Sequence, residues 1–234
     1  MSFDRWRSLV DGAEIDLGSA IPDSDNLHAE YNLQEQPEGD GATIDTLIDQ
    51  SDNGFDADAV GSPTMDVDGF DGQQAAVLDG ANDGWDIPES VWESLDQPFT
   101  FYAVFSIDGE SDDRHHIFDY LTDGSRVLAS RDSDEVWRLN AGSSLDNSAG
   151  ISNNVVAMRY DSTDSLSEIG LPPTTETGDG GTNSIEDVSI GRNAPSDSEY
   201  FEGRIMHLMW YDAGHDTETR DDVRSYLDSL WNLS

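Results

Sequence analysis

Short runs of alternating apolar and polar residues, separated by Gly- and Asp-rich turns, recur along the chain from residue 75 onward. The clearest run is 99–107, where every second side chain is apolar and would lie on one face of a sheet. Residues 203–211 carry apolar side chains on both faces, which predicts a central strand covered on both sides. Further strands are expected at 75–78, 115–120, 126–130, 135–139, 154–160, 166–170 and 187–192.

The turns between these runs predict how the strands pair. The segments at 122–125 and 132–134 are short and rich in Asp, Gly and Ser, so 115–139 is expected to form a three-stranded meander. The turn at 161–164 predicts that 154–160 pairs with 166–170.

One helix is predicted, at the C-terminus. Asp216 or Thr217 can cap its first turn. Its apolar stripe at helical spacing consists of Val223, Tyr226, Leu227, Leu230 and Trp231. Many short strands and one closing helix predict an all-β fold, a two-sheet antiparallel jelly-roll sandwich with a C-terminal α-helix.

The first 26 residues differ from the rest of the chain. They begin with aromatic and basic side chains, and Phe3, Trp6 and Arg7 are candidate docking or oligomerisation residues. We interpret 1–26 as an N-terminal arm and 27–234 as the sandwich domain; a first edge strand of the main domain is an equally good interpretation of 1–26. Residues 35–75 are expected to form long loops around one short helical or extended piece at 43–48.

Composition changes the picture chiefly through charge. Leu, Ile, Val and Phe make up 49 of 234 residues, near the disordered range, but the clustered aromatics favour a packed core. The net charge is −39, and all 11 basic residues are Arg. Such an excess of carboxylates is typical of proteins that work in concentrated salt, where self-repulsion is screened. Binding to nucleic acid or insertion into a membrane is not expected, because no basic patch or long apolar segment is present.

The absence of Cys excludes disulfides, thiolate metal sites and cysteine nucleophiles. The N-terminal residues contain no apolar run long enough for a secretion signal. If the protein acts outside a cell, we therefore expect it to leave by another route, such as cell lysis or assembly into a particle.

Several segments resemble one family when taken in order. Residues 49–57, DQSDNGFDA, resemble the D-x-S-G-N-G-x-D-A segment of concanavalin A-like and laminin-G-like sandwich domains, with Asp52 where that pattern has Gly. Residues 78–88, LDGANDGWDIP, are similar to its F-D-G-x-N-D-Y-V-x-I-P segment, and 190–192, 201–212 and 220–227 resemble its closing strands and helix. The resemblance covers about 27–233 and implies a lectin-like jelly roll.

In very acidic chains without a signal, such domains resemble tail-fibre, turret or capsid decoration proteins of tailed viruses of halophilic archaea. This resemblance implies a virion surface protein whose lectin-like head attaches to a host-surface glycan or glycoprotein. It also implies that the protein is assembled in the host cytoplasm and released by lysis into a high-salt medium. Its N-terminal arm would bind other virion proteins and form a homo-oligomer, a trimer or pentamer. A ligand-free decoration protein, a secreted halophilic lectin and a glycan hydrolase are the alternatives.

One loop combines candidate metal and sugar ligands. Asp79, Asn82 and Asp83 offer hard oxygen donors of the kind that Ca²⁺ prefers, although a solvated loop is the simpler reading in so acidic a chain. Trp85 could stack on a sugar ring beside Asn82 and Asp83, or it could plug one end of the sandwich. His115 and His116 are adjacent in a strand and would face opposite sides, so they are not expected to share a metal ion.

No sequence motif for catalysis is complete. The acids of sandwich hydrolases follow E-x-D-x-x-E, and Glu14 and Asp16 supply the first two positions, but Ser19 stands at the third. No G-x-S-x-G elbow, phosphate loop or H-E-x-x-H segment is present. From these observations we expect a protein that is not an enzyme.

Overall fold

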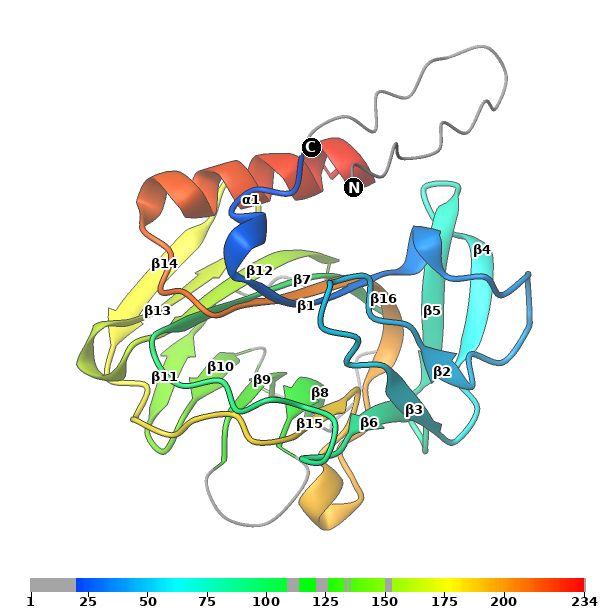
Figure 1. Cartoon of the computed structure of the whole chain (residues 1–234), viewed down its shortest axis with the longest axis horizontal. Coiled ribbons are helices and arrows are strands. Elements are labelled where there is room, and N and C mark those ends of the chain that lie inside the picture. The colour runs from blue at the N-terminus through cyan, green and yellow to red at the C-terminus, as the bar shows by residue number, and fades with distance from the viewer. Residues whose placement is uncertain are drawn as a thin grey trace.

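The computed structural model describes residues 20–108, 114–120, 126–132, 134, 136–149 and 153–233. Two eight-stranded antiparallel sheets pack against each other, and one long helix lies on the outer side of one of them (Figure 1). The predicted two-sheet jelly-roll sandwich with a C-terminal helix is confirmed. None of the helices in the described residues is long and apolar enough to cross a membrane.

The first sheet carries the helix. Its strand order is β14-β13-β12-β7-β16-β5-β4, and β1 pairs with β16 beside this path. The bounds are β1 Leu27–Asn32, β4 Thr64–Phe70, β5 Gln73–Asp79, β7 Phe99–Ile107, β12 Asn153–Tyr160, β13 Ser165–Ile169, β14 Thr174–Gly178 and β16 Glu202–Tyr211.

The second sheet lies on the side away from the helix, in the order β11-β10-β9-β8-β15-β6-β3-β2. Its strands are β2 Thr46–Leu47, β3 Ala57–Val60, β6 Gly84–Ile87, β8 His115–Asp119, β9 Leu128–Arg131, β10 Trp137–Asn140, β11 Ser144–Asn147 and β15 Val188–Ile190. The helix α1 spans Thr217–Trp231, and the 3₁₀ turns are η1 Ser24–Asn26, η2 Leu33–Glu35, η3 Ser162–Asp164 and η4 Ala194–Ser196.

Strand alternation places the core as predicted. In β7, Phe101 and Phe105 point into the core between the sheets, whereas Tyr102 and Val104 point toward the cluster under α1. The same division holds in β16, so both strands are buried on both faces. The meander β8-β9-β10 and the β12-β13 pair are also confirmed.

The C-terminal helix begins where the sequence predicts. The Asp216 carboxylate accepts a hydrogen bond from the Thr219 amide at 2.9 Å, which caps the free N–H groups of the first turn. Val223, Leu227 and Trp231 are buried against the first sheet. The predicted apolar stripe is therefore the face that attaches α1 to the sheet.

The segment 35–75 differs from the predicted long loops. It contains β2, β3 and β4, which are short or interrupted by Asp and Gly and are held by pairing with neighbouring strands. The segment at 43–48 is extended, since β2 lies within it. Strands β1, β6, β11 and β14 were also not predicted, because they are short or lack a clear alternation.

Of the predicted N-terminal arm, only residues 20–26 are described. Ile21 is buried in the cluster under α1, and the Asp23 carboxylate contacts His215 Nε2 at 3.1 Å. This end of the arm therefore packs on the sandwich. Phe3, Trp6 and Arg7 lie outside the described residues, so their proposed role stays a prediction.

Candidate functional site on the outer face of the second sheet

A row of polar side chains crosses the outer face of the second sheet, the face turned away from the first sheet. Cα pairing aligns Asp58 with Asp86, Asp86 with Ser189, and Ser189 with Asp119. On the other side of the bulge in β8, Ser130 is aligned with His116 and with Arg138, and Arg138 is aligned with Asp146. We call this set the polar row: Asp58, Asp86, Ser189, Asp119, Ser130, Arg138 and Asp146.

The flanking residues show which way the row faces. Val188 and Ile190, on either side of Ser189, both belong to the core between the sheets. Trp85 and Ile87 flank Asp86 in the same way. Because neighbouring residues of a strand point to opposite faces, Ser189 and Asp86 point outward.

A buried histidine links the middle of the row to a covering loop. His116 is fully buried; its Nδ1 lies 3.2 Å from Asp119 Oδ2 and its Nε2 lies 3.1 Å from Glu199 Oε2. Asp119 also accepts from Arg126 Nη2 at 2.6 Å. A carboxylate therefore lies beside each ring nitrogen of this imidazole.

These contacts keep the two carboxylates ionised. The hydrogen bond from His116, opposed by partial burial and assisted by Asn193, lowers the pKa of Glu199 to about 2. Burial raises the pKa of Asp119, but hydrogen bonds from His116 and Arg126 outweigh it and leave this pKa below its ordinary value. Ionised carboxylates accept hydrogen bonds and do not donate protons, so these two suit hydroxyl binding and not general-acid chemistry.

The loop 193–200 lies over this part of the sheet and contains η4. It is held from below by Arg192, whose Nη2 donates to Asp86 at 2.6 Å and whose Nη1 donates to Asp197 at 3.1 Å. Asn193 Nδ2 donates to Glu199 at 2.6 Å. In Figure 1 the loop projects from the second sheet on the side away from α1. It thus sets a group of polar side chains at fixed positions above the row.

Tyr200 stands out among the aromatic side chains of the described residues. It is partly exposed and belongs to neither hydrophobic cluster, whereas Phe70 and Tyr226, the other rings that are not buried, pack against the cluster under α1. Its hydroxyl donates to Asp197 at 2.5 Å, and this bond raises the pKa of Tyr200. An accessible aromatic face beside carboxylates is typical of sites that bind sugars.

Two hydroxyls in the row have no hydrogen-bond partner in the described part of the chain. Ser130 Oγ and Ser189 Oγ are both buried and unpaired, and so is Asp86 Oδ1. An unpaired buried polar atom costs free energy unless water or a ligand satisfies it. These three oxygens of the polar row are therefore available to hydrogen-bond water or a ligand.

The structure corrects the expectation that Trp85 presents an open ring. Trp85 is fully buried in the core between the sheets, and its Nε1 donates to the Ile44 carbonyl at 3.1 Å. Its ring has no face free for a sugar. Trp85 therefore fills the interior of the sandwich, which was the alternative interpretation of this residue. Asp58 and Asp86, in contrast, lie on the opposite face of the same part of the sheet.

The loop proposed for calcium uses its carboxylates internally. Asp83 is buried and accepts from the Ser62 amide at 2.8 Å, and Asp79 accepts from the Ala81 amide at 2.9 Å. The described residues contain no group of three or more His, Cys, Asp or Glu side chains that could hold a metal ion. These bonds use part of the acceptor capacity of Asp79 and Asp83, and calcium binding by Asp79, Asn82 and Asp83 stays a prediction.

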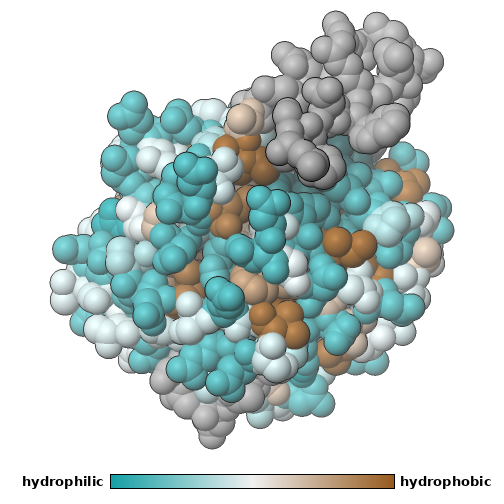
Figure 2. Space-filling view, in the orientation of Figure 1, coloured by the Kyte–Doolittle hydropathy of each residue, from teal (hydrophilic) through white to brown (hydrophobic). Residues whose placement is uncertain are grey.

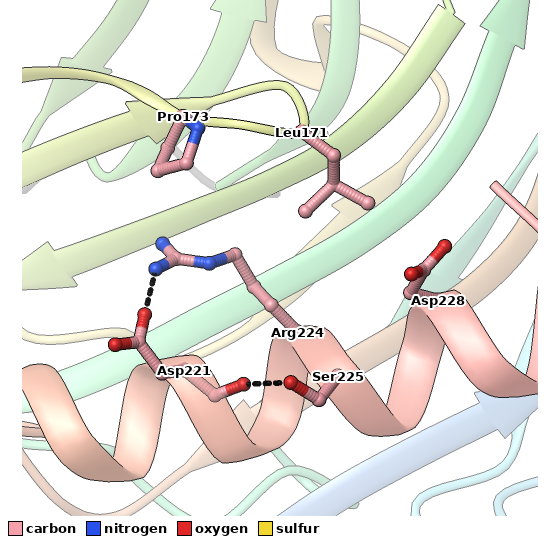
Figure 3. Close-up of a pocket in the computed structure, with 6 residues that line it drawn as sticks. All are labelled: Leu171, Pro173, Asp221, Arg224, Ser225 and Asp228. Atoms are coloured by element: carbon pink, nitrogen blue, oxygen red, sulfur yellow. Dashed lines mark hydrogen bonds and ion pairs between the residues drawn. The ribbon is translucent and has the colours of Figure 1, made fainter. Parts of the chain in front are cut away.

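A pocket of about 210 Å³ lies on the other side of the molecule, between α1 and the turn after β13. Figure 3 shows Arg224 reaching from α1 toward Pro173, with its guanidinium bonded to Asp221. The same guanidinium also bonds Glu168 beneath the helix. Because the Arg224 guanidinium is bonded to Asp221 and Glu168, it is not available to bind an anion in this pocket.

No known protein family and no curated protein matches this chain by sequence. Solved structures do match. A mutant Trypanosoma rangeli sialidase with trans-sialidase activity has a TM-score of 0.64 at 13% identity, covering 93% of this chain and 35% of its own. A GH54 α-L-arabinofuranosidase has a TM-score of 0.60 at 11% identity, covering 80% and 50%. The binding domain of botulinum neurotoxin serotype D/C has a TM-score of 0.59 at 13% identity, covering 88% and 53%.

These matches show the fold, and this chain spans only about a third to a half of those proteins. They overturn the expectation that the chain is not an enzyme, because sialidases and an arabinofuranosidase point toward glycan-active enzymes. The sialidase and the arabinofuranosidase act on glycans, so the shared fold is compatible with carbohydrate binding. None of them links the chain to a virus or a halophile.

Proposed function

We propose that the chain recognises carbohydrate on the outer face of its second sheet, at the loop 193–200. The single observation that carries this proposal is Tyr200, an accessible aromatic ring outside both hydrophobic clusters and bonded to a carboxylate. One face of a sugar ring is lined by C–H groups and packs on such an aromatic surface. The resemblance to glycan-active sandwich proteins supports the same ligand class.

The surrounding side chains would orient the sugar. Asp197 and Glu199 flank the ring in the same loop, and Asp86 lies below them in the polar row. Their carboxylates accept hydrogen bonds from sugar hydroxyls. Arg192 and His116 hold these carboxylates in place before a ligand arrives, which lowers the entropy lost on binding.

Substitution of Tyr200 tests the proposal. In about 2 M NaCl, Tyr200→Ala should weaken binding to a responsive glycan about tenfold, the effect of losing one stacking contact. Tyr200→Phe keeps the ring and should bind within about threefold of the wild type. Isothermal titration against glycans first identified on an array provides the measurement. Equal binding by the Ala variant would rule out this loop as the site.

Glycan turnover is the second candidate function, and the sialidase and arabinofuranosidase neighbours favour it. Any glycan bound on the array should be incubated with the protein and assayed for released reducing ends. If product is released, Glu199→Gln separates the roles: retained turnover with weaker binding supports an acceptor role for Glu199. Loss of turnover with unchanged binding would place Glu199 in the reaction instead.

We further propose that this recognition takes place on a virion surface in concentrated salt, where a host glycan or glycoprotein is the target. The net charge of −39 supports the setting. The N-terminal arm with Phe3, Trp6 and Arg7 would bind other virion proteins and join copies into a trimer or pentamer. Labelling Ser234 on purified particles of halophilic viruses tests the location, and light scattering of the chain with and without 1–19 tests the oligomer. If the labelled protein is absent from the particles, a secreted lectin becomes the preferred hypothesis.

A further inference from the structure

The arginines near the proposed sugar site are already paired with carboxylates. Arg192 bonds Asp86 at 2.6 Å and Asp197 at 3.1 Å, and its side chain is only 9% exposed. Arg126 bonds Asp119 through two hydrogen bonds of 3.2 and 2.6 Å. In Arg192 both terminal nitrogens are used in this way, and the remaining Nε–H is buried, so this guanidinium presents no accessible edge to a further anion.

The rest of the face follows the same pattern. Arg138 bonds Asp146 through two hydrogen bonds of 2.8 and 3.0 Å and lies 3.5 Å from Asp132. The charge of Arg114 acts on Asp146 and Glu199, and His116 lies between two carboxylates. Carboxylates therefore outnumber arginines among the described residues of this face, and the local charge is negative.

A sugar that carries a carboxylate meets two obstacles here. It approaches a negative surface, and to bind Arg192, the arginine that contacts the Tyr200 loop, it must displace Asp86 or Asp197. Displacement of Asp86, whose side chain is 21% exposed, would leave a partly buried carboxylate unpaired, which is costly. Asp197 is 76% exposed and would stay solvated when displaced, but it would then lie beside a second negative charge. An uncharged sugar meets neither obstacle, because its hydroxyls can donate to carboxylates that keep their arginine partners.

We propose that this face takes an uncharged, hydroxyl-rich sugar and discriminates against sugars that carry a carboxylate. The inference rests on the proposed function and adds the ligand class to it. The discrimination arises in the group formed by Arg192, Asp86 and Asp197. Arg192 is already bonded to Asp86 and to Asp197, the carboxylate that Tyr200 contacts, so it is not available to a carboxylate of the ligand.

The first test compares neutral oligosaccharides with sialylated forms of the same oligosaccharides on one array. About 2 M NaCl confines electrostatics to a few ångströms, so the comparison reports local contacts and not the total charge. We expect neutral forms to be bound and sialylated forms to be bound at least tenfold more weakly. Equal or stronger binding of sialylated forms overturns this inference but leaves carbohydrate recognition standing. Binding of no glycan overturns the proposed function itself.

The second test removes the negative charges that bind Arg192. The double variant Asp86→Asn with Asp197→Asn keeps the shape of both side chains but removes the charges that occupy Arg192. The ratio of sialylated to neutral binding should rise at least fivefold. The matched control, Glu218→Gln with Asp222→Asn, removes the same two charges from exposed positions of α1. Circular dichroism in the same salt confirms folding, and an equal rise in the control would overturn the role of Arg192.

Discussion

At the scale of single residues, buried histidines recur as connectors between distant segments. All five histidines of the chain are buried, and three of them contact a carboxylate. His207 accepts from Trp231 Nε1 at 3.2 Å, so its Nε2 carries the proton that bonds Glu30 at 3.1 Å. His116 joins β8 to the loop 193–200 through Glu199. Each of these rings therefore links segments that are distant in the sequence.

The bond between His116 and Glu199 predicts acid sensitivity. The pKa of Glu199 is lowered from 4.5 to about 2, so its stabilising contribution is complete above pH 4.5 and is lost as the pH falls toward 2. We expect the melting temperature of the wild type to fall across this window, and that of Glu199→Gln to fall less. Thermal melts in molar salt measure both, with exposed Glu89→Gln as the control. Identical slopes for wild type and Glu199→Gln would contradict the assignment.

At the scale of elements, a buried ion cluster fastens the helix to the first sheet. Glu168 in β13 accepts from Arg220 Nε at 3.0 Å and from Arg224 Nη1. All three side chains are at most 7% exposed. The apolar stripe gives α1 its affinity for the sheet, and these ion pairs set its position along β13.

Removal of Glu168 should be far more damaging than removal of an exposed partner. Glu168→Ala leaves two buried guanidinium groups without their shared carboxylate and should lower the free energy of unfolding by about 3–5 kcal/mol. Asp221→Asn affects a carboxylate that is 60% exposed and should cost less than about 1 kcal/mol. Denaturant titrations in molar salt provide both values. Similar losses for the two variants would show that burial does not govern this cluster.

At the scale of the whole molecule, charge dominates the surface. The net charge is −39 for 234 residues, and Figure 2 shows a mainly hydrophilic face with small, separate apolar patches. The apolar side chains that would be needed for stability are collected in two buried clusters, one between the sheets and one under α1. Folding must therefore overcome repulsion that salt can screen.

Stability is expected to depend strongly on ionic strength. Between about 0.1 and 3 M NaCl the melting temperature should rise by about 10 °C or more, because screening removes several kcal/mol of self-repulsion. Differential scanning calorimetry measures the rise. Sucrose at matched osmolality is the control, since it favours the compact state without screening charge. Full stability at low salt, or an equal effect of sucrose, would contradict adaptation to salt.

The sequence alone determined the parts of the fold that depend on local periodicity. Alternation predicted the faces of β7 and β16, and the spacing of Val223, Leu227 and Trp231 predicted the face of α1 that packs on the sheet. These predictions succeeded because period and burial are properties of a single segment. Charge, likewise, follows from composition without any knowledge of the fold.

Only the tertiary structure decided where the candidate site lies. The polar row draws on residues from 58 to 189, and strand pairing, with a bulge in β8, brings them onto one face of the sheet. Trp85 and Tyr200 both lie in polar surroundings in the sequence, yet one is in the core and the other is accessible. Which of them meets solvent depends on the segments that pack over it, and those come from distant parts of the chain.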